Sequence, residues 1–192
     1  MLELFGDNNS AVLVIGCFHG DEPQGKYLIE KYLEYNPNTK ICFIPCLNKY
    51  GFKNNIRTNK NGVDLNRNFP TKNWILSDKD NFYGGESPAS EDETKFLINV
   101  INKNKPKLIL TLHAPYKVVN YDGPAKEVSD KISDIINYPV EESIGYPTPG
   151  SFGTWAGIER QIPTVTLELD EEVNVEELIK PIFKIFEMIE NY

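Results

Sequence analysis

The chain has 192 residues, of which 40% are hydrophobic and 25% are charged, and its net charge at pH 7 is -8. This length predicts one globular domain over residues 1–192, and the net negative charge argues against a nucleic-acid or anionic-membrane partner. The apolar runs are too short for a membrane span, and the first residues lack the basic segment of a signal peptide. We therefore expect a cytoplasmic protein, and its oligomeric state stays open.

Apolar, β-branched runs alternate with segments of helical periodicity along the whole chain. Residues 11–17 predict a strand, residues 23–35 a helix and residues 41–47 a second strand. Residues 48–89 predict a long loop, which in a compact domain is usually functional or disordered. The remaining segments predict, in chain order, a helix over 90–102 that opens with a capping box at Ser90 to Glu93, a strand over 107–113, a helix over 125–137, a short strand over 139–144, a short helix over 152–160, a strand over 163–169 and a helix over 175–190. This alternation predicts an α/β three-layer sandwich, with a mixed, mostly parallel central sheet flanked by helices.

The three cysteines do not form a metal-binding pattern. Cys42 and Cys46 share a face of the predicted second strand, but they lie ~13 Å apart at ~3.3 Å per residue, beyond the reach of a disulfide. Cys17 falls in the first strand. We expect three buried thiols in a reducing compartment.

The only two histidines each follow or end an apolar run. His19 comes directly after the apolar run over 11–18, Glu22 follows it by three residues, and His113 ends the strand over 107–113. Side chains at strand ends gather at one edge of an open α/β sheet. A His, Glu and His set leaves zinc one open position, which is typical of a catalytic site, so we expect one zinc ion per chain. The alternative for His19 alone is a hydrogen-bonded core histidine.

Arginine is scarce, with three arginines against seventeen lysines, and two of the three lie in one loop. The segment from Arg57 to Pro70 resembles the substrate-binding loop of the zinc carboxypeptidase superfamily, in which an Asn-Arg pair binds the free carboxylate of the substrate. The resemblance implies that Asn66 and Arg67 bind this carboxylate and that Arg57 stabilises the developing oxyanion. Asp64 is expected to orient Arg57 or a ligand histidine, or to be a turn residue. The alternative for the whole segment is a loop with surface salt bridges.

The last predicted strand carries a carboxylate near its end. Glu168 follows a Gly/Ser-rich turn and Trp155, as the general base of the carboxypeptidases does, so the resemblance implies that role for Glu168. It also implies that Tyr146 caps the substrate and that Gly153 leaves room in the side-chain pocket. Asp170 is the neighbouring carboxylate, one strand period further on.

Two loops point to a narrower family. Residues 62–70 and 145–155 resemble the murein peptide amidase A family, whose members hydrolyse the amide bond between γ-D-glutamate and meso-diaminopimelate in the cytoplasm during cell-wall recycling. This resemblance implies a zinc metallopeptidase or amidase of the carboxypeptidase type, acting on a small peptide with a free carboxylate. Only 90 residues separate Glu22 from His113, so pocket loops and substrate identity can differ.

Three alternatives to this function stay open at the level of sequence. An aspartoacylase-like deacylase of N-acyl amino acids shares the His-x-x-Glu, Asn-Arg and His plan. A general metallocarboxypeptidase would use the same residues on ordinary C-terminal peptides. A non-catalytic carboxylate-binding module would keep the arginine loop without turnover.

Overall fold

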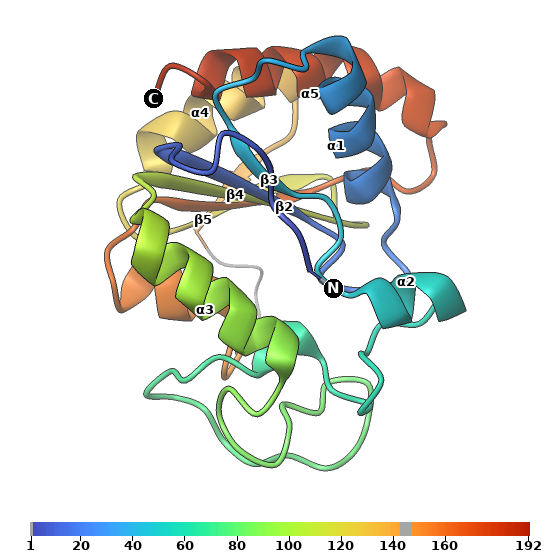
Figure 1. The fold of residues 1–192 in the computed structure, drawn as a ribbon, viewed down its shortest axis with the longest axis vertical. Coiled ribbons are helices and arrows are strands. Elements are labelled where there is room, and N and C mark those ends of the chain that lie inside the picture. The colour runs from blue at the N-terminus through green and yellow to red at the C-terminus, as the bar shows by residue number, and fades with distance from the viewer. Residues whose placement is uncertain (1, 143–146) are drawn as a thin grey trace.

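A seven-stranded sheet lies between two layers of helices in the computed structural model, which describes residues 2–142 and 147–192 (Figure 1). The strands follow the order β1-β3-β2-β4-β7-β5-β6 across the sheet. Their bounds are β1 Phe5–Gly6, β2 Val12–Gly16, β3 Cys42–Ile44, β4 Leu108–His113, β5 Val118–Asp122, β6 Val140–Glu141 and β7 Thr164–Glu168. The pairs β1–β3 and β5–β7 are antiparallel and the other pairs are parallel, so the expected mixed, mostly parallel sheet is confirmed.

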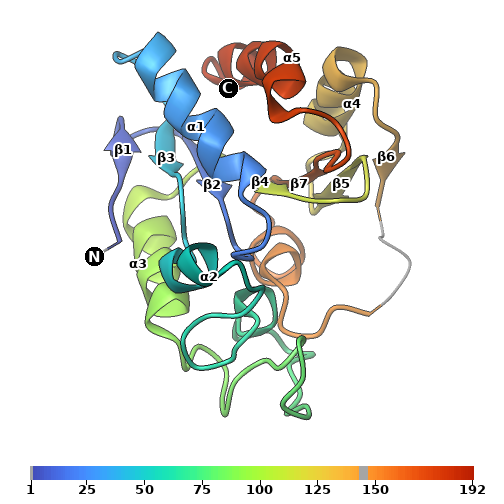
Figure 2. The same cartoon turned by 90° about the vertical axis from the view of Figure 1, so that its right-hand side faces the viewer.

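Helices cover both faces of this sheet. The helical elements are α1 Gln24–Tyr35, α2 Lys49–Asn54, η1 Leu65–Arg67, α3 Asp92–Asn104, α4 Lys126–Ile136, η2 Thr154–Ile158 and α5 Val175–Ile189. Helices α1, α4 and α5 lie on one face, and α3 lies on the other with the long loop beyond it (Figure 2). The expected three-layer sandwich is confirmed, and no helix of the described residues is long and apolar enough to cross a bilayer.

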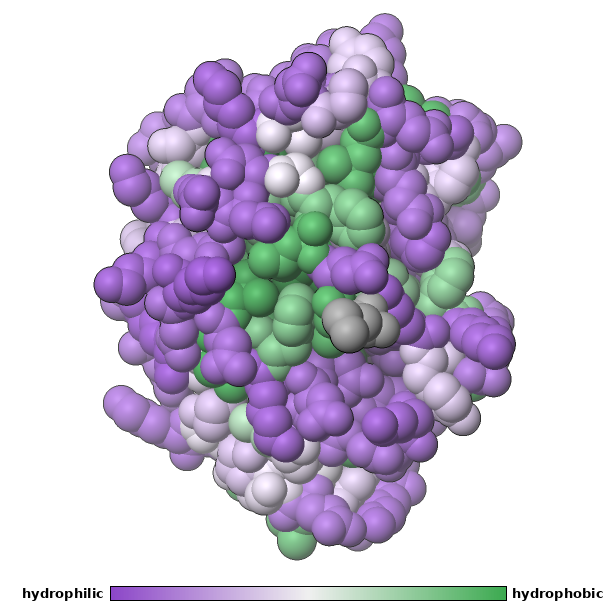
Figure 3. Space-filling model, viewed as in Figure 1, coloured by the Kyte–Doolittle hydropathy of each residue, from purple (hydrophilic) through white to green (hydrophobic). Residues whose placement is uncertain are grey.

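The central strands are buried on both faces because both are covered. In β2, Val12 and Val14 join the core beneath α1, α4 and α5, whereas Leu13 and Ile15 join the core beneath α3. Such a strand is apolar throughout rather than alternating, which is why it is visible in the sequence as a continuous apolar run. On the face in Figure 3, hydrophilic residues surround an apolar area near the centre, in keeping with the high charge content. All three cysteines are buried and free, as expected.

The prediction of a capping box at Ser90 to Glu93 is wrong. Helix α3 begins at Asp92 and its N-cap residue, Glu91, makes no side-chain capping bond. Instead, Ser90 Oγ donates to Glu91 Oε1 at 2.7 Å, and Glu91 Oε2 accepts from Asn59 and Asn61, each at 2.7 Å. These side chains therefore hold the long loop against the start of α3, a tertiary contact that replaces the local capping geometry.

Three other boundaries differ from the expectation. The loop over 48–89 contains α2 and η1, and the strand expected over 41–47 is limited to Cys42–Ile44. The short helix expected over 152–160 contains a π-helical turn, η2. Strand β5, which the sequence pattern did not predict, pairs with β7 and extends the sheet beside the candidate site.

Candidate metal centre and substrate cleft

Three adjacent parallel strands bring the expected site residues to one edge of the sheet. His19 lies three residues after the end of β2, His113 is the last residue of β4 and Glu168 is the last residue of β7. The β4–β7 register pairs His113 directly with Glu168. Since parallel strands all end at the same edge, residues far apart in sequence meet there.

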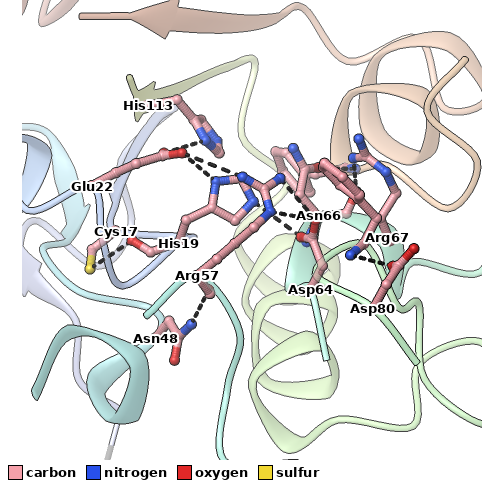
Figure 4. A network of polar contacts seen from close by, with 12 residues as sticks. Cys17, His19, Glu22, Asn48, Arg57, Asp64, Asn66, Arg67, Asp80 and His113 are labelled. Carbon is pink, nitrogen blue, oxygen red and sulfur yellow. Dashed lines mark hydrogen bonds and ion pairs between the residues drawn. The ribbon is translucent and has the colours of Figure 1, made fainter. Parts of the chain in front are cut away.

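The three expected metal ligands converge on one point. Donor atoms of His19, Glu22 and His113 all lie within 4.8 Å of one another. The Nδ1 atom of His19 lies 2.7 Å from Glu22 Oε1, and that of His113 lies 3.0 Å from Glu22 Oε2 (Figure 4). Two imidazole nitrogens and one carboxylate, all buried and this close, fit a zinc ion with one coordination position left for water or substrate.

One carboxylate supports both the metal centre and an arginine. Asp64 is fully buried, and its Oδ1 atom lies 3.1 Å from the second ring nitrogen of His19. Its Oδ2 atom accepts hydrogen bonds from Arg57 Nε at 3.0 Å and Nη2 at 2.9 Å. The sequence left open whether Asp64 orients Arg57 or a ligand histidine, and Asp64 contacts both (Figure 4). It thereby fixes the ring of His19 and the guanidinium of Arg57 in position.

The electrostatics of this cluster favour charged partners. Burial opposes protonation of His19, but attraction to Glu22 and Asp64 outweighs it and raises the pKa of His19 to about 9. Burial opposes ionisation of Glu22 as well, yet His19 and His113 hold the pKa of this carboxyl well below its usual range. Two carboxylates therefore concentrate negative charge around the imidazoles, and a bound cation would take the place of the proton on His19.

Glu168 faces the cleft as an incompletely satisfied carboxylate. It is buried, and its Oε2 atom has no hydrogen-bond partner among the described residues. Burial and the nearby charge of Glu22 raise the pKa of Glu168. A buried carboxylate without full partners lowers stability, and such groups with a raised pKa cluster at functional sites because they can take up a proton. The neighbouring Asp170 instead pairs with Lys117 at 2.8 Å.

A cleft of about 640 Å³ connects the metal centre to the arginine loop, and Asn66, Arg67, Gly153 and Glu168 line it. Asn66 Oδ1 accepts from the backbone N–H of Phe152 at 2.8 Å, which leaves the amide donor of Asn66 without a described partner. Arg67 donates to the backbone carbonyl of Asn66 at 2.8 Å and makes no described ion pair. Two adjacent donor side chains with unused capacity are suited to binding a carboxylate.

The structure adds residues that the sequence analysis did not single out. Phe82 lies with its ring 5.1 Å from the guanidinium carbon of Arg57 and 5.9 Å from that of Arg67. Asp122 also lines the cleft, beside Gly153. The one signal for Asp122 was the alternation of apolar and polar residues over 119–122. Tyr146, expected to cap the substrate, lies outside the described residues.

The turn that carries His19 and Glu22 packs tightly on α2. A Cβ atom at Gly20 would lie 1.9 Å from the backbone carbonyl carbon of Gly51, so Gly20→Ala must push the turn away from α2. We expect this change to lower the free energy of unfolding by about 1–3 kcal/mol and to weaken zinc binding, measured by denaturant titration and metal titration. Lys53→Ala is the control, because Lys53 is an exposed residue of the same helix. Equal effects of the two changes would contradict the packing argument.

Comparison with known proteins gives one consistent group of matches. The family model of zinc carboxypeptidases matches residues 5–145. Murein peptide amidase A of Vibrio campbellii is 32% identical over 182 residues, covering 85% of this chain and 71% of the relative. Murein peptide amidase A of Escherichia coli K12 is 31% identical over 157 residues, covering 74% of this chain and 64% of the relative. The chain thus spans about two thirds of the length of these relatives.

Solved structures agree with this group. The crystal structure of murein-tripeptide amidase from Escherichia coli O157 has a TM-score of 0.86 at 26% identity, covering 97% of this chain and 85% of that one. Thrombin activatable fibrinolysis inhibitor has a TM-score of 0.74 at 19% identity, covering 95% of this chain and 63% of that one, a likeness of fold alone.

Proposed function

The chain belongs to the zinc carboxypeptidase family, and from this premise we propose that it is a zinc-dependent amidase of peptidoglycan-derived peptides. As a member it is a metallopeptidase or amidase, and its family implies a peptide substrate. The bond we propose is the amide between γ-D-glutamate and meso-diaminopimelate. The similarity to the murein peptide amidases supports this choice of bond. A cytoplasmic location, where such peptides are recycled, is part of the proposal.

One observation carries the catalytic part of the proposal. The ligand set of His19, Glu22 and His113 opens into the same cleft as the incompletely satisfied carboxylate of Glu168. The guanidinium of Arg67, which has no ion-pair partner among the described residues, lines the cleft too. A bound zinc ion would supply Lewis-acid chemistry, activating a water and polarising the scissile carbonyl. A proton acceptor and a carboxylate-binding arginine in reach of the same space are what amide hydrolysis at a chain end requires.

Each proposed role follows from where the side chain lies. Glu168 would accept the proton of the attacking water and pass it to the departing amine. Arg57 would donate hydrogen bonds to the carbonyl oxygen as negative charge develops there. Asn66 and Arg67 would bind the carboxylate beside the leaving amine, which fixes the scissile bond over Glu168.

Two further residues belong to the proposal. We propose that Gly153, which lines the cleft, forms part of the wall of the pocket for the substrate side chain. We also propose that Tyr146 caps the bound substrate.

The carboxylate-binding role of Arg67 has a measurable consequence. Replacing Arg67 with alanine removes a charge-assisted, bidentate contact that substrate and transition state share, so we expect KM to rise about 10–100-fold with a smaller change in kcat. Arg160→Ala is the matched control, since Arg160 donates to the backbone of Trp155 and does not line the cleft. An unchanged KM in Arg67→Ala would contradict this role.

The direct test of the proposed bond is release of free diaminopimelate from L-Ala-γ-D-Glu-meso-diaminopimelate by the zinc-loaded protein. An N-acetyl amino acid and an α-linked C-terminal dipeptide serve as competing substrates. We expect the γ-linked tripeptide to have the highest kcat/KM. Preferred hydrolysis of the N-acetyl amino acid would point to a deacylase, and preferred hydrolysis of the α-linked dipeptide to a general carboxypeptidase. No turnover of any of the three would contradict an enzymatic role.

A further inference from the structure

The roles proposed above give no task to Asp122, a partly buried carboxylate of the cleft. Asp122 is the last residue of β5 and lines the cleft. Among the described residues its carboxylate has no hydrogen-bond or ion-pair partner, and burial alone raises the pKa of Asp122 to about 6. Burial thus disfavours the ionised form of this carboxylate. A carboxylate in such a place, without a partner among the described residues, is suited to binding a ligand group of opposite charge.

Close contact with glycine backbone fixes where this carboxylate lies. A Cβ atom at Gly153 would lie 2.0 Å from Asp122 Oδ2, and a Cβ atom at Gly157 would lie 2.4 Å from Asp122 Cβ. The side chain of Asp122 thus packs directly on the chain around η2, where any larger residue would displace it. Gly153 therefore makes room for Asp122 as well as for a substrate side chain.

The β5–β7 ladder sets the distance from the proposed reaction centre. Its register pairs Asn120 with Thr166 and Asp122 with Thr164, and Glu168 is the residue at the other end of β7. Directly paired residues project to the same face, so Glu168, the Asn120–Thr166 pair and Asp122 follow one another along the wall of the cleft. Four residues separate the level of Glu168 from that of Asp122, which is ~13 Å at ~3.3 Å per residue.

We propose that Asp122 selects the leaving amino acid by pairing with an ammonium group at the end of its side chain. The inference rests on the proposed function, because it takes the leaving residue to be held by Asn66 and Arg67 with its amide at Glu168. From there a long, unbranched side chain extends along the Asn120–Thr166 pair toward Asp122. The side chain of lysine ends in an ammonium group, and that of diaminopimelate ends in an ammonium group beside a carboxylate. Norleucine has a chain of similar length without either charge.

The test compares three tripeptides, L-Ala-γ-D-Glu-Xaa, in which Xaa is meso-diaminopimelate, L-lysine or L-norleucine. A charge-assisted contact in a partly buried site changes kcat/KM about 10–100-fold, so the wild type should favour the two amino-bearing substrates by that factor. Asp122→Asn should lose this preference while its kcat/KM for the norleucine peptide stays within about two-fold. The unchanged norleucine rate also shows that the variant is folded. Glu171→Gln, which removes the same charge from an exposed residue of the cleft, should keep the preference.

The outcomes separate this inference from the proposed function. Turnover of all three peptides with the same preference in wild type and Asp122→Asn would overturn the role of Asp122 and leave the amidase proposal standing. Turnover of none would contradict the amidase proposal. Calorimetric binding of L-lysine and L-norleucine to the zinc-loaded proteins then decides the role of Asp122. The role is supported if the wild type binds lysine more tightly than norleucine and Asp122→Asn loses this difference. Equal binding of both amino acids by the wild type would overturn it.

Discussion

Replacing Glu168 with glutamine is expected to lower kcat by about 10²–10⁴-fold while zinc binding and the fold persist. The amide has nearly the shape of the carboxylate but cannot accept the proton of the attacking water. Glu168 Oε2 has no described hydrogen-bond partner, so the exchange breaks no bond of that atom. The ligand atoms of the metal site belong to other residues, so the zinc content should stay at the wild-type value. Initial-rate kinetics beside metal analysis measure both quantities.

Asp170→Asn is the matched control for this change. Asp170 lies two residues further along the same segment, pairs with Lys117 and does not line the cleft. Its replacement should leave kcat within a few-fold of the wild type. A Glu168→Gln protein that keeps most of its activity with zinc bound would contradict the role of general base, and equal losses in both variants would point to a general disturbance of the strand end.

Replacing His113 with alanine is expected to abolish high-affinity zinc binding and, with it, activity above background. The change removes one of three metal-ligand atoms that lie within 4.8 Å of one another. It also removes the His113 nitrogen that lies 3.0 Å from Glu22 Oε2. A ligand that binds only the native state raises the melting temperature, so zinc should raise Tm of the wild type and have little effect on His113→Ala. Differential scanning fluorimetry with and without zinc measures this independently of turnover.

Thr111→Val is the control for the histidine change. Thr111 lies two residues earlier in β4 and bonds to Thr166 rather than to the metal site. It should lower stability modestly, because a buried hydrogen bond is lost, and it should keep the zinc-dependent rise in Tm. If His113→Ala also keeps that rise, His113 is not a metal ligand.

The strands at the centre of the fold were visible in the sequence because they are buried on both faces. Strand β2 is a continuous apolar run, β4 is apolar except for Thr111 and its last residue, and β7 alternates threonine with apolar residues before Glu168. His19 follows the end of β2, and His113 and Glu168 are the last residues of β4 and β7. The same pattern that predicts each strand thus predicts one edge of the sheet as the site. The role of Glu168 was implied by the resemblance of the Gly/Ser-rich turn and Trp155 to the carboxypeptidases.

What the sequence did not predict depends on contacts between distant segments. His19 and Asp64 are 45 residues apart, and nothing local to Asp64 distinguishes a partner of His19 from a partner of Arg57. Strand β5 is short and only half apolar, and its place is set by pairing with β7. Asp122 is therefore recognisable as part of the cleft only once β5 is placed beside η2. The prediction of a capping box at Ser90 was wrong for a similar reason. Asn59 and Asn61, which are distant in sequence, donate hydrogen bonds to the carboxylate of Glu91.

Titration of the metal-stripped protein with zinc, with diaminopimelate release followed at each addition, tests the central claim most directly. The account predicts that turnover rises in proportion to added zinc and levels off at one equivalent per chain. It also predicts that the His113→Ala protein shows neither the binding nor the rise. Turnover that is complete without zinc, or zinc that binds at one equivalent without any release of diaminopimelate, would contradict the assignment of His19, Glu22 and His113 as the metal centre of a zinc amidase.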